Sequence, residues 1–313
     1  MDPLELIQHG KIKRHFRATR KLTAPKLVSH ITQRAAGKEP LFIEDDDYLF
    51  MLHLLKEISQ AHTLIVFSFC LMPNHVHLLV SPKGNNLSDA MRDLFARYAM
   101  RFNKKYERKG HLFGGPYRQA VCLDDTYLLA ASLYIHLNPV KSGLADDPLK
   151  FRWSSCRLFC DPAAPESFVE PEFILQLLSH GRGNYEREVY SEMLKKAAGL
   201  KQGNVMEQGD SIEKFRKKLA ALFPDFFRKV GKKKKIAMIS GIEMSSWEEL
   251  ESQIENFQNT GLSRKPSEQK AKQFLIMQLI SRGYKRAEIS EKLGISIKTV
   301  YNILNSTVKR PQF

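Results

Sequence analysis

Two histidines separated by one residue, His75 and His77, are the side chains of this sequence best suited to hold a metal ion. They follow the turn-forming pair Pro73-Asn74 and stand in an apolar segment that continues through Leu79. In a β-strand, residues two apart point to the same face of the sheet, so both imidazoles share a face with Leu79. Because neutral imidazole is the commonest metal ligand in proteins, the pattern indicates a metal site. The alternative is a pair of polar side chains on the solvated face of an edge hairpin.

A tyrosine and an asparagine four residues apart form the second candidate group. The spacing of apolar residues predicts a helix over 124–137, and Pro139 is expected to prevent its continuation beyond Asn138. In this helix Tyr127, Tyr134 and Asn138 lie on one stripe, because four and seven residues are close to whole turns. A helical tyrosine is most often half-buried packing, so the stripe alone does not identify a nucleophile. His136 falls on roughly the opposite side of the helix and is not expected to be a ligand.

The segments that must position these residues follow one another as strand, helix, strand, strand, helix, strand. In chain order we predict strand 27–34, helix 45–58, two paired strands within 64–80, helix 87–102 and strand 117–123. This order is the split βαβ arrangement of a ferredoxin-like antiparallel sheet with helices on one face, and the predicted fold class is α+β. A fold of this kind does not by itself define a function.

The net charge favours a polyanionic partner. The 313 residues carry a formal charge of +15, and residues 201–313 contain 22 Lys+Arg against 12 Asp+Glu. Such an excess suits nucleic acid, whose phosphates release counterions on binding, better than a membrane, because no basic amphipathic helix with a matching apolar face is evident. No apolar run approaches the roughly 20 residues of a membrane span. The four cysteines form no paired metal motif, which favours a reduced, cytoplasmic protein. With nucleic acid as the favoured partner, association with the nucleoid is expected.

Basic residues on the domain suggest where DNA would lie. The predicted helix over 87–102 has a basic face that includes Arg97 and Arg101, and this face is either solvated or a surface that follows phosphates. Arg118, at the entry to the last predicted strand, is a candidate phosphate contact. His30, on the first strand, could face the site or DNA, although a surface or packing role is the more usual one.

The C-terminal region is expected to be all-helical. Segments 269–282, 287–293 and 296–304 have helical spacing, and Gly294 is placed to turn the chain between the last two. These two resemble a helix-turn-helix of the Trp-repressor or resolvase-tail kind. On that reading the residues facing the major groove are Ser296, Lys298, Thr299, Tyr301 and Asn302. The predicted division of the chain is a catalytic domain over 1–165, a helical or linker region over 166–262, and the helix-turn-helix over 263–313.

Two motifs taken together resemble a known family. MPNHVHLLV (72–80) and YIHLNPVKSGL (134–144) are similar to motifs of the HUH single-strand DNA transposases, in which two histidines flank a bulky apolar residue. The resemblance is specifically to the REP-associated tyrosine transposases and their IS200-like relatives. It covers about residues 10–160, with further family-like segments in LVSHITQRA (27–35), GGPYR (114–118) and FRWSS (151–155).

The resemblance implies a mechanism and a substrate. His75 and His77, with Asn138 as a further ligand, would hold Mg²⁺ or Mn²⁺, and Tyr134 would attack single-stranded DNA to form a 5′-phosphotyrosine link. A free phenol, with a pKa near 10, is a poor nucleophile and needs such activation. The expected partners are single-stranded DNA hairpins, REP-like or at element ends, with duplex DNA as a further partner of the helix-turn-helix and a monomer or homodimer as the working unit. The alternatives are a domesticated, non-cleaving DNA-binding regulator, and a replication-initiator or relaxase nuclease.

Overall fold

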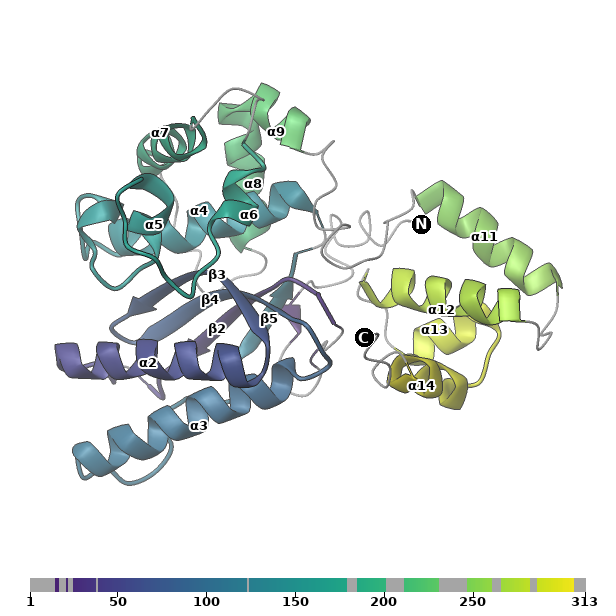
Figure 1. The fold of residues 1–313 in the computed structure, drawn as a ribbon, viewed down its shortest axis with the longest axis horizontal. Helices are drawn as coiled ribbons and strands as arrows, with labels where there is room; N and C mark the ends of the chain where they lie inside the picture. Colours follow the sequence, from purple (N-terminus) through teal and green to yellow (C-terminus); the bar gives the residue numbers. More distant parts are fainter. Residues whose placement is uncertain are drawn as a thin grey trace. The chain divides into compact units, whose positions relative to one another are not determined.

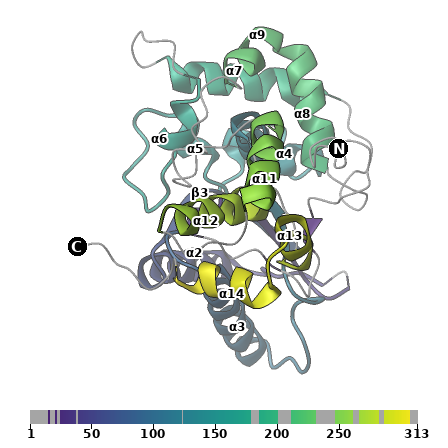
Figure 2. The same ribbon diagram turned by 90° about the vertical axis from the view of Figure 1, so that its right-hand side faces the viewer.

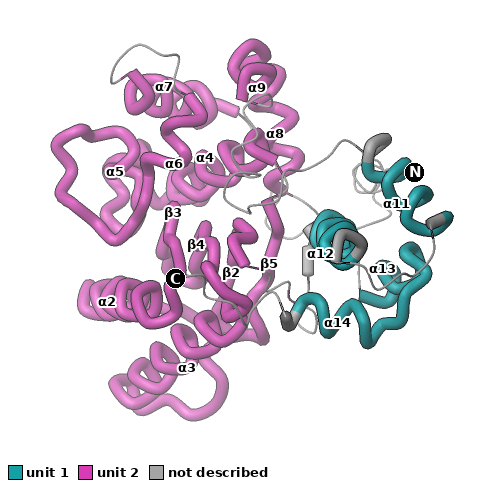
Figure 3. Tube along the Cα trace, turned by 45° about the vertical axis from the view of Figure 1, so that its right-hand side comes forward, with its two compact units in different colours: residues 1–14, 237–313 teal, residues 15–236 magenta. Residues whose placement is uncertain are grey.

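The computed structural model describes residues 15–16, 21, 25–37, 39–122, 124–178, 185–200, 211–230, 247–260, 266–281 and 286–306. Figure 1 shows the elements along the chain. The chain divides into two compact units, residues 15–236 and residues 1–14 with 237–313, which Figure 3 distinguishes by colour. The region 166–236 belongs to the same unit as the sheet, so the boundary at 165 predicted from the sequence does not coincide with the division between the units.

A single antiparallel sheet of five strands forms the centre of the larger unit. Its order is β1-β5-β2-β4-β3, and every neighbouring pair is antiparallel. The strands are β1 (His15–Phe16), β2 (Ser29–Arg34), β3 (Leu64–Met72), β4 (His75–Pro82) and β5 (Arg118–Val121). The four longer strands follow the ferredoxin-like pattern, in which the first strand lies between the third and the fourth. The predicted α+β fold class is therefore confirmed.

One face of the sheet is covered by α2 (Asp45–Ala61) and α3 (Leu87–Lys105), as Figure 1 shows. The apolar stripes of both helices pack on the side chains that alternate along the strands, among them Ile31, Val76 and Leu78. The period-two pattern of β4 thus separates an apolar face from the face that carries the histidines. This core fixes the register of β4 because a slip by one residue would bury the histidines under α2 and α3.

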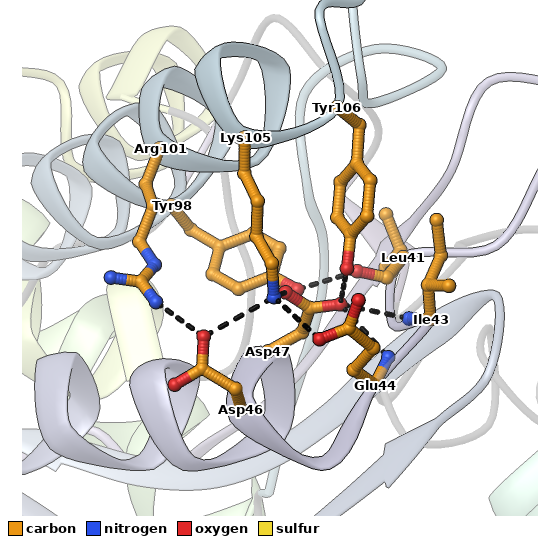
Figure 4. A network of polar contacts seen from close by, with 9 residues as sticks. All are labelled: Leu41, Ile43, Glu44, Asp46, Asp47, Tyr98, Arg101, Lys105 and Tyr106. Carbon is orange, nitrogen blue, oxygen red and sulfur yellow. Dashed lines mark hydrogen bonds and ion pairs between the residues drawn. The ribbon is translucent and has the colours of Figure 1, made fainter.

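Polar contacts also fasten α2 to α3, as Figure 4 shows. The buried carboxylate of Asp47 accepts hydrogen bonds from the backbone N–H groups of Ile43 (2.9 Å) and Glu44 (3.1 Å), which caps the start of α2. Tyr106, just after α3, donates its hydroxyl proton to the same carboxylate at 2.8 Å, and Lys105 Nζ lies 2.9 Å from it. The two helices are therefore joined at this end by a carboxylate that is out of contact with solvent.

The opposite face of the sheet is covered by α4 (Asp125–Lys141), which is buried along almost its whole length. The prediction that Pro139 ends this helix is wrong, because Pro139 lies inside its last turn. Proline lacks the N–H that would bond the carbonyl four residues back, but one lost bond near a C-terminus is tolerated. The helix closes beyond it, where the Ser142 N–H bonds the carbonyl of Asn138 at 3.0 Å. The extension keeps Asn138 and Lys141 on the helical stripe of Tyr134.

Further helices pack on α4 in the same unit. They are the short α5 (Cys156–Cys160) and α6 (Glu172–Leu175), then α7 (Glu186–Ala198), α8 (Ser211–Leu222) and α9 (Pro224–Val230), with a 3₁₀ turn at Pro148–Lys150. The stretch after 199 mixes glycine and charge, and its helices α8 and α9 were not predicted from the sequence. Figure 2 shows α8 next to α4. The sequence predicted helices on one face of the sheet only. The structure has them on both faces, because α4 and the helices packed on it cover the second face.

The smaller unit is helical in its described parts. Its helices are α11 (Trp247–Thr260), α12 (Pro266–Ser281), α13 (Arg286–Leu293) and α14 (Ile297–Ser306). Gly294, with φ of +63°, makes the turn between α13 and α14, a conformation that favours glycine. Its core includes the buried apolar residues Ile289, Leu293, Ile295, Val300 and Leu304. In the part of the chain that the structure describes, no helix is long and apolar enough to cross a membrane.

Candidate functional site

The face of the sheet under α4 gathers polar side chains in two neighbouring rows. On β4, His77 pairs with Thr32 of β2, which in turn pairs with Arg118 of β5. In the adjacent row His75 pairs with Arg34 of β2. Residues that pair directly across antiparallel strands point to the same face, so all five side chains lie on the side of α4. The prediction that the two histidines share one face is therefore confirmed.

Helix α4 places Tyr134 above these histidines. The ring centroid of Tyr134 lies 6.1 Å from that of His77 and 6.4 Å from that of His30, both in edge contacts. Asn138 follows one turn later on the same stripe. His75, His77 and Asn138 are each 3% exposed and Tyr134 is 5% exposed. His77 and Tyr134, almost 60 positions apart in the sequence, are thus brought together between the sheet and one helix.

The hydrogen bonds of the two histidines leave one nitrogen of each without a partner. His75 Nδ1 lies 2.6 Å from Asn74 Oδ1, an acceptor, so this nitrogen carries the proton. His77 Nδ1 lies 2.9 Å from His30 Nε2 and 3.3 Å from Thr32 Oγ1. The Nε2 atoms of both histidines are buried and have no hydrogen-bond partner among the described residues. The tautomer of His77 in which Nδ1 donates to His30 leaves the Nε2 lone pair for an ion, and His75 has the same arrangement; metal-binding imidazoles are held in this way.

Unsatisfied polar atoms are concentrated here. Buried side-chain nitrogen and oxygen atoms normally have partners, so each exception calls for a reason. Within the described ranges seven such atoms lack one, and four belong to His75, His77, Asn138 and Lys141. The atom of Asn138 is Nδ2, and the assignment of nitrogen and oxygen in such an amide is interchangeable. These two imidazole nitrogens and the Asn138 amide are therefore the candidate ligands for a metal ion.

The donor set is smaller than that of an acidic metal centre. No three His, Cys, Asp or Glu side chains are grouped to hold a metal ion anywhere in the described residues. The set of two imidazoles and one amide fits a divalent ion that retains open coordination positions for other ligands. Nitrogen and amide ligands do not by themselves select Mg²⁺ or Mn²⁺ over Zn²⁺.

Burial keeps the histidines neutral. Desolvation, with a smaller contribution from the charge of Arg34, lowers the pKa of His75 to about 4. Desolvation likewise holds the pKa of His77 well below its ordinary value, and the charges of His75, His30, Arg34 and Lys141 lower it further. Both imidazoles are therefore uncharged at neutral pH, which is the protonation state that a metal ion requires.

Burial favours the protonated form of the Tyr134 phenol. Desolvation raises the pKa of its phenol, while a hydrogen bond with Ser211 and the charge of Arg34 act in the opposite direction. Ser211 is the first residue of α8, and Phe215, one turn later, makes an edge contact with the Tyr134 ring at 6.0 Å. Helix α8 therefore covers the phenol.

The structure places His136, another candidate residue of α4, away from this group. It points to the opposite side, as predicted, with its ring nitrogens 2.8 Å from Tyr190 Oη and from Ser155 Oγ. Tyr127, two turns before Tyr134 on the same helix, is fully buried.

The predicted DNA-contacting arginines differ in their surroundings. Arg97 forms a bidentate ion pair with Glu57 of α2 at 2.8 Å, and Arg101 pairs with Asp46 at 2.5 Å. Their charges are balanced within the protein, and a contact with DNA stays a prediction. Arg118 is exposed and lies in the same row as His77.

On α14 the side chains of Lys298, Tyr301 and Asn302 are exposed, as a surface contact requires. Thr299 is half-buried, and its Oγ1 lies 2.8 Å from Ser296 Oγ. Ser296 Oγ also accepts from the Thr299 N–H at 3.1 Å and so caps the helix. The Arg286 guanidinium lies 4.3 Å from the centroid of the Tyr301 ring. Contacts of these residues with DNA stay a prediction.

Sequence reasoning assigned no site role to Lys141, Ser211 or Phe215, and it favoured a surface or packing role for His30. His30 is two residues from Thr32 on β2, and the alternation of that strand could have placed it on the face of His77. Lys141 is seven residues after Tyr134, which is two turns. No sequence pattern indicated that α8 would pack on this part of α4.

Fold and site together define an antiparallel α+β domain with two histidines on a central strand and one tyrosine on the helix that covers them. Residues 23–138 match the family model described as "Transposase IS200 like". The match includes His75, His77, Tyr134 and Asn138 and ends before Lys141 and α8. Family model and structure therefore agree on the part of the chain that holds the candidate site.

One solved structure similar to this chain is titled "Structure of the REP associates tyrosine transposase bound to a REP hairpin". The similarity covers 50% of this chain and 94% of that chain, with 12% sequence identity and a TM-score of 0.42. This likeness is too distant to define a function. No curated protein matches the chain.

Proposed function

We propose that the unit formed by residues 15–236 is a metal-dependent DNA strand transferase that cleaves and rejoins single-stranded DNA through Tyr134. The match of residues 23–138 to the IS200-like transposases supports a transposase role. The observation that carries the finer proposal is the pair of buried, unpartnered Nε2 atoms of His75 and His77, together with the contact of the His77 and Tyr134 rings. A nucleophile and a cation site within one cluster are what phosphoryl transfer to a tyrosine requires.

The proposed reaction exchanges one phosphoester bond for another. Tyr134 Oη forms a bond to phosphorus as the bond from phosphorus to the 3′ oxygen breaks. The phenol proton is released, and the departing oxygen takes up a proton to become a 3′-OH. The product is a 5′-phosphotyrosine, which the 3′-OH of another strand can attack in reverse. The energy of the phosphodiester is retained in the link, so rejoining needs no nucleotide cofactor.

The cation would be held by His75 and His77, with the Asn138 amide as a further ligand. A bound divalent ion acts as a Lewis acid that polarises the phosphate and orients it for attack. We propose Mg²⁺ or Mn²⁺ because of the family resemblance, since the ligands themselves do not select these ions. Asn74, His30 and Thr32 contact the Nδ1 atoms and hold the two rings in orientation.

We propose single-stranded DNA with hairpins, REP-like or at the ends of an element, as the substrate class. The support is the family resemblance together with the net charge of +15. Arg118 is the best-placed exposed residue to contact a phosphate near the site, because it shares the row of Thr32 and His77. An arginine presents a planar fork of donors that matches phosphate oxygens.

The test is a cleavage assay with labelled single-stranded hairpin oligonucleotides, in Mn²⁺ or Mg²⁺, with Tyr134→Phe in parallel. We expect a protein–DNA adduct that survives a denaturing gel and is lost in the variant and in EDTA. Tyr127→Phe is the matched control on the same helix, and we expect it to form the adduct. An adduct that persists in Tyr134→Phe would move the nucleophile to another residue. Hairpin binding without any adduct would favour the alternative, a non-cleaving DNA-binding regulator.

A second proposal concerns the smaller unit, which we propose binds duplex DNA through α14. Lys298, Tyr301 and Asn302 are exposed on this helix, and Arg286 lies against Tyr301. A recognition helix reads base edges with such side chains in the major groove.

The test uses a DNA duplex that the full chain has selected from a random pool of sequences. We expect Asn302→Ala to bind this duplex about tenfold or more weakly. The exposed Lys270→Ala on α12 is the control. Equal binding by both variants would contradict the proposal.

A further inference from the structure

Lys141 is held at the candidate site with its ammonium group out of contact with solvent. Its Nζ has no hydrogen-bond partner among the described residues. The group lies between two aromatic rings, 4.7 Å from the centroid of Tyr134 and 3.9 Å from that of Phe215. A cation between two aromatic faces is attracted by both, but this attraction is weaker than a charged hydrogen bond.

An enclosed ammonium without an anion is unusual, because burial of a charge is unfavourable unless the charge is paired. No carboxylate forms an ion pair with Lys141 in the described part of the chain, whereas Lys105 and Lys150 each have one. Desolvation, with a smaller contribution from Lys218 on α8, lowers the pKa of Lys141 to about 7. Lys141 is therefore an enclosed basic group that no anionic side chain of the described residues neutralises.

The position of Lys141 relates it to the other site residues. Tyr134, Asn138 and Lys141 succeed one another on one stripe of α4, and this stripe exists because the helix continues past Pro139. The charge of Lys141 is also felt at His77, where it lowers the pKa of the imidazole. Arg34 of β2 acts on the same imidazole from the sheet. Two cations, one from each layer, therefore flank the histidines and Tyr134.

We propose that Lys141 is a catalytic residue whose ammonium group binds a non-bridging oxygen of the scissile phosphate and of the phosphotyrosine that follows. This inference rests on the proposed function of Tyr134. The phosphate supplies the anion that the lysine lacks, next to the ring whose oxygen becomes bonded to phosphorus. Such a contact strengthens as negative charge develops on the phosphate oxygens, which accelerates the reaction.

A role as general base fits the geometry less well. A base must reach the phenol proton, but Lys141 lies over the face of the Tyr134 ring, and the hydroxyl is hydrogen-bonded with Ser211. A purely structural role would be served as well by methionine, which has a similar length and packs against aromatic rings. Lys141→Met therefore separates charge from packing.

The first test measures single-turnover adduct formation and hairpin affinity for the wild type, Lys141→Met, Lys141→Arg and the control Lys150→Met. We expect adduct formation by Lys141→Met to be about 100-fold slower, while its hairpin affinity changes by less than about threefold. Lys141→Arg should recover part of the rate because it restores a cation. Lys150, exposed and paired with Asp146, should be replaceable without effect. An adduct rate of Lys141→Met within about threefold of the wild type would overturn the proposal.

The second test does not require cleavage. Thermal unfolding of the full chain is followed in inorganic phosphate and in chloride at equal ionic strength. We expect phosphate to raise the Tm of the wild type by about 2–4 °C and to have no such effect on Lys141→Met. If the wild type forms no adduct on any DNA, the proposed function fails, and this measurement alone decides whether Lys141 forms an anion site. An equal response of both proteins would then overturn the inference.

Discussion

The Nδ1 atom of His77 lies 2.9 Å from the Nε2 atom of His30, and the two rings are stacked with centroids 5.1 Å apart. Because this contact occupies Nδ1, the Nε2 atom of His77 is left buried and unpartnered. His30 thus acts on the candidate cation site through His77, as a positioning residue. Thr32 Oγ1, 3.3 Å from the same Nδ1, is a second neighbour that orients the ring.

We expect His30→Ala to weaken the binding of Mn²⁺ about 10- to 100-fold, as the loss of an orienting contact to a metal-binding histidine generally does. Isothermal titration of the full chain, stripped of metal with EDTA, measures this affinity. His75→Ala should abolish the binding, and the exposed His53→Ala on α2 serves as the control. If His30→Ala bound Mn²⁺ as tightly as His53→Ala, the positioning role of His30 would be excluded.

The fold, and the faces on which the candidate residues lie, were accessible from the sequence for physical reasons, whereas the roles of Tyr134 and Asn138 were inferred from the family resemblance. The alternation of β4 placed His75 and His77 on one face, and helical spacing placed Tyr134 and Asn138 on one stripe. These are local periodicities, which depend on neighbours along the chain. The ferredoxin-like order followed from the succession of such segments.

What could not be predicted depends on contacts between distant segments. Pro139 was expected to end α4, but the tertiary surroundings of that helix outweigh the loss of one hydrogen bond. The pairing of Arg97 with Glu57 joins residues 40 positions apart, so no local pattern revealed it. The packing of α8 over Tyr134 is likewise a long-range contact. Residues such as Lys141 acquire their chemistry from this packing.

The carboxylate of Asp47 should be the most important polar group for the stability of the α2–α3 layer. Although desolvation acts against it, the hydrogen bonds from Ile43, Lys105, Glu44 and Tyr106 hold the pKa of Asp47 below its ordinary value. We expect Asp47→Asn to lower the free energy of unfolding by about 2–4 kcal/mol at pH 7, because the buried donors lose a charged acceptor. Urea unfolding followed by circular dichroism measures the change.

The pH dependence of this effect has a definite sign. Because the folded pKa of Asp47 lies below the unfolded value, its charge stabilises the fold above the unfolded pKa. This contribution is lost as the pH falls through the folded pKa. The difference between the wild type and Asp47→Asn should therefore shrink below about pH 4. The more exposed Asp46→Asn is the control and should have a much smaller effect. A difference that is constant from pH 7 to pH 3 would contradict this account.

Lys141 should destabilise the folded protein at neutral pH. Its folded pKa of about 7 lies below the ordinary 10.5, so the unfolded chain binds more protons between these values. The free energy of unfolding of the wild type should accordingly rise with pH over this range. Below pH 7 the folded protein bears the full cost of burying the charged ammonium. We expect Lys141→Met to be more stable than the wild type by about 1–3 kcal/mol at pH 7, and by less at pH 9 to 10. Urea titrations at each pH test this, with Lys150→Met as the matched control. A destabilised Lys141→Met would mean that the ammonium has a partner in solution.

The contacts of α8 predict that a substitution outside the candidate site can alter the access of DNA to Tyr134. Arg216 of α8 donates to Thr126 Oγ1 at the start of α4, at 3.1 Å, and so helps to hold α8 over the phenol. Since Tyr134 is only 5% exposed and α8 contacts it through Ser211 and Phe215, we expect α8 to move away when DNA binds. Loss of one such hydrogen bond weakens the closed state by about 1 kcal/mol, which raises the open population about fivefold.

We expect Arg216→Ala to form the phosphotyrosine adduct up to about fivefold faster and the amides of α8 to exchange hydrogen faster. Arg228→Ala, which breaks an exposed pair with Asp225 on α9, should change neither quantity. Faster exchange without a faster adduct would show that opening of α8 does not limit the reaction. Unchanged exchange would show that Arg216 does not hold the helix in place.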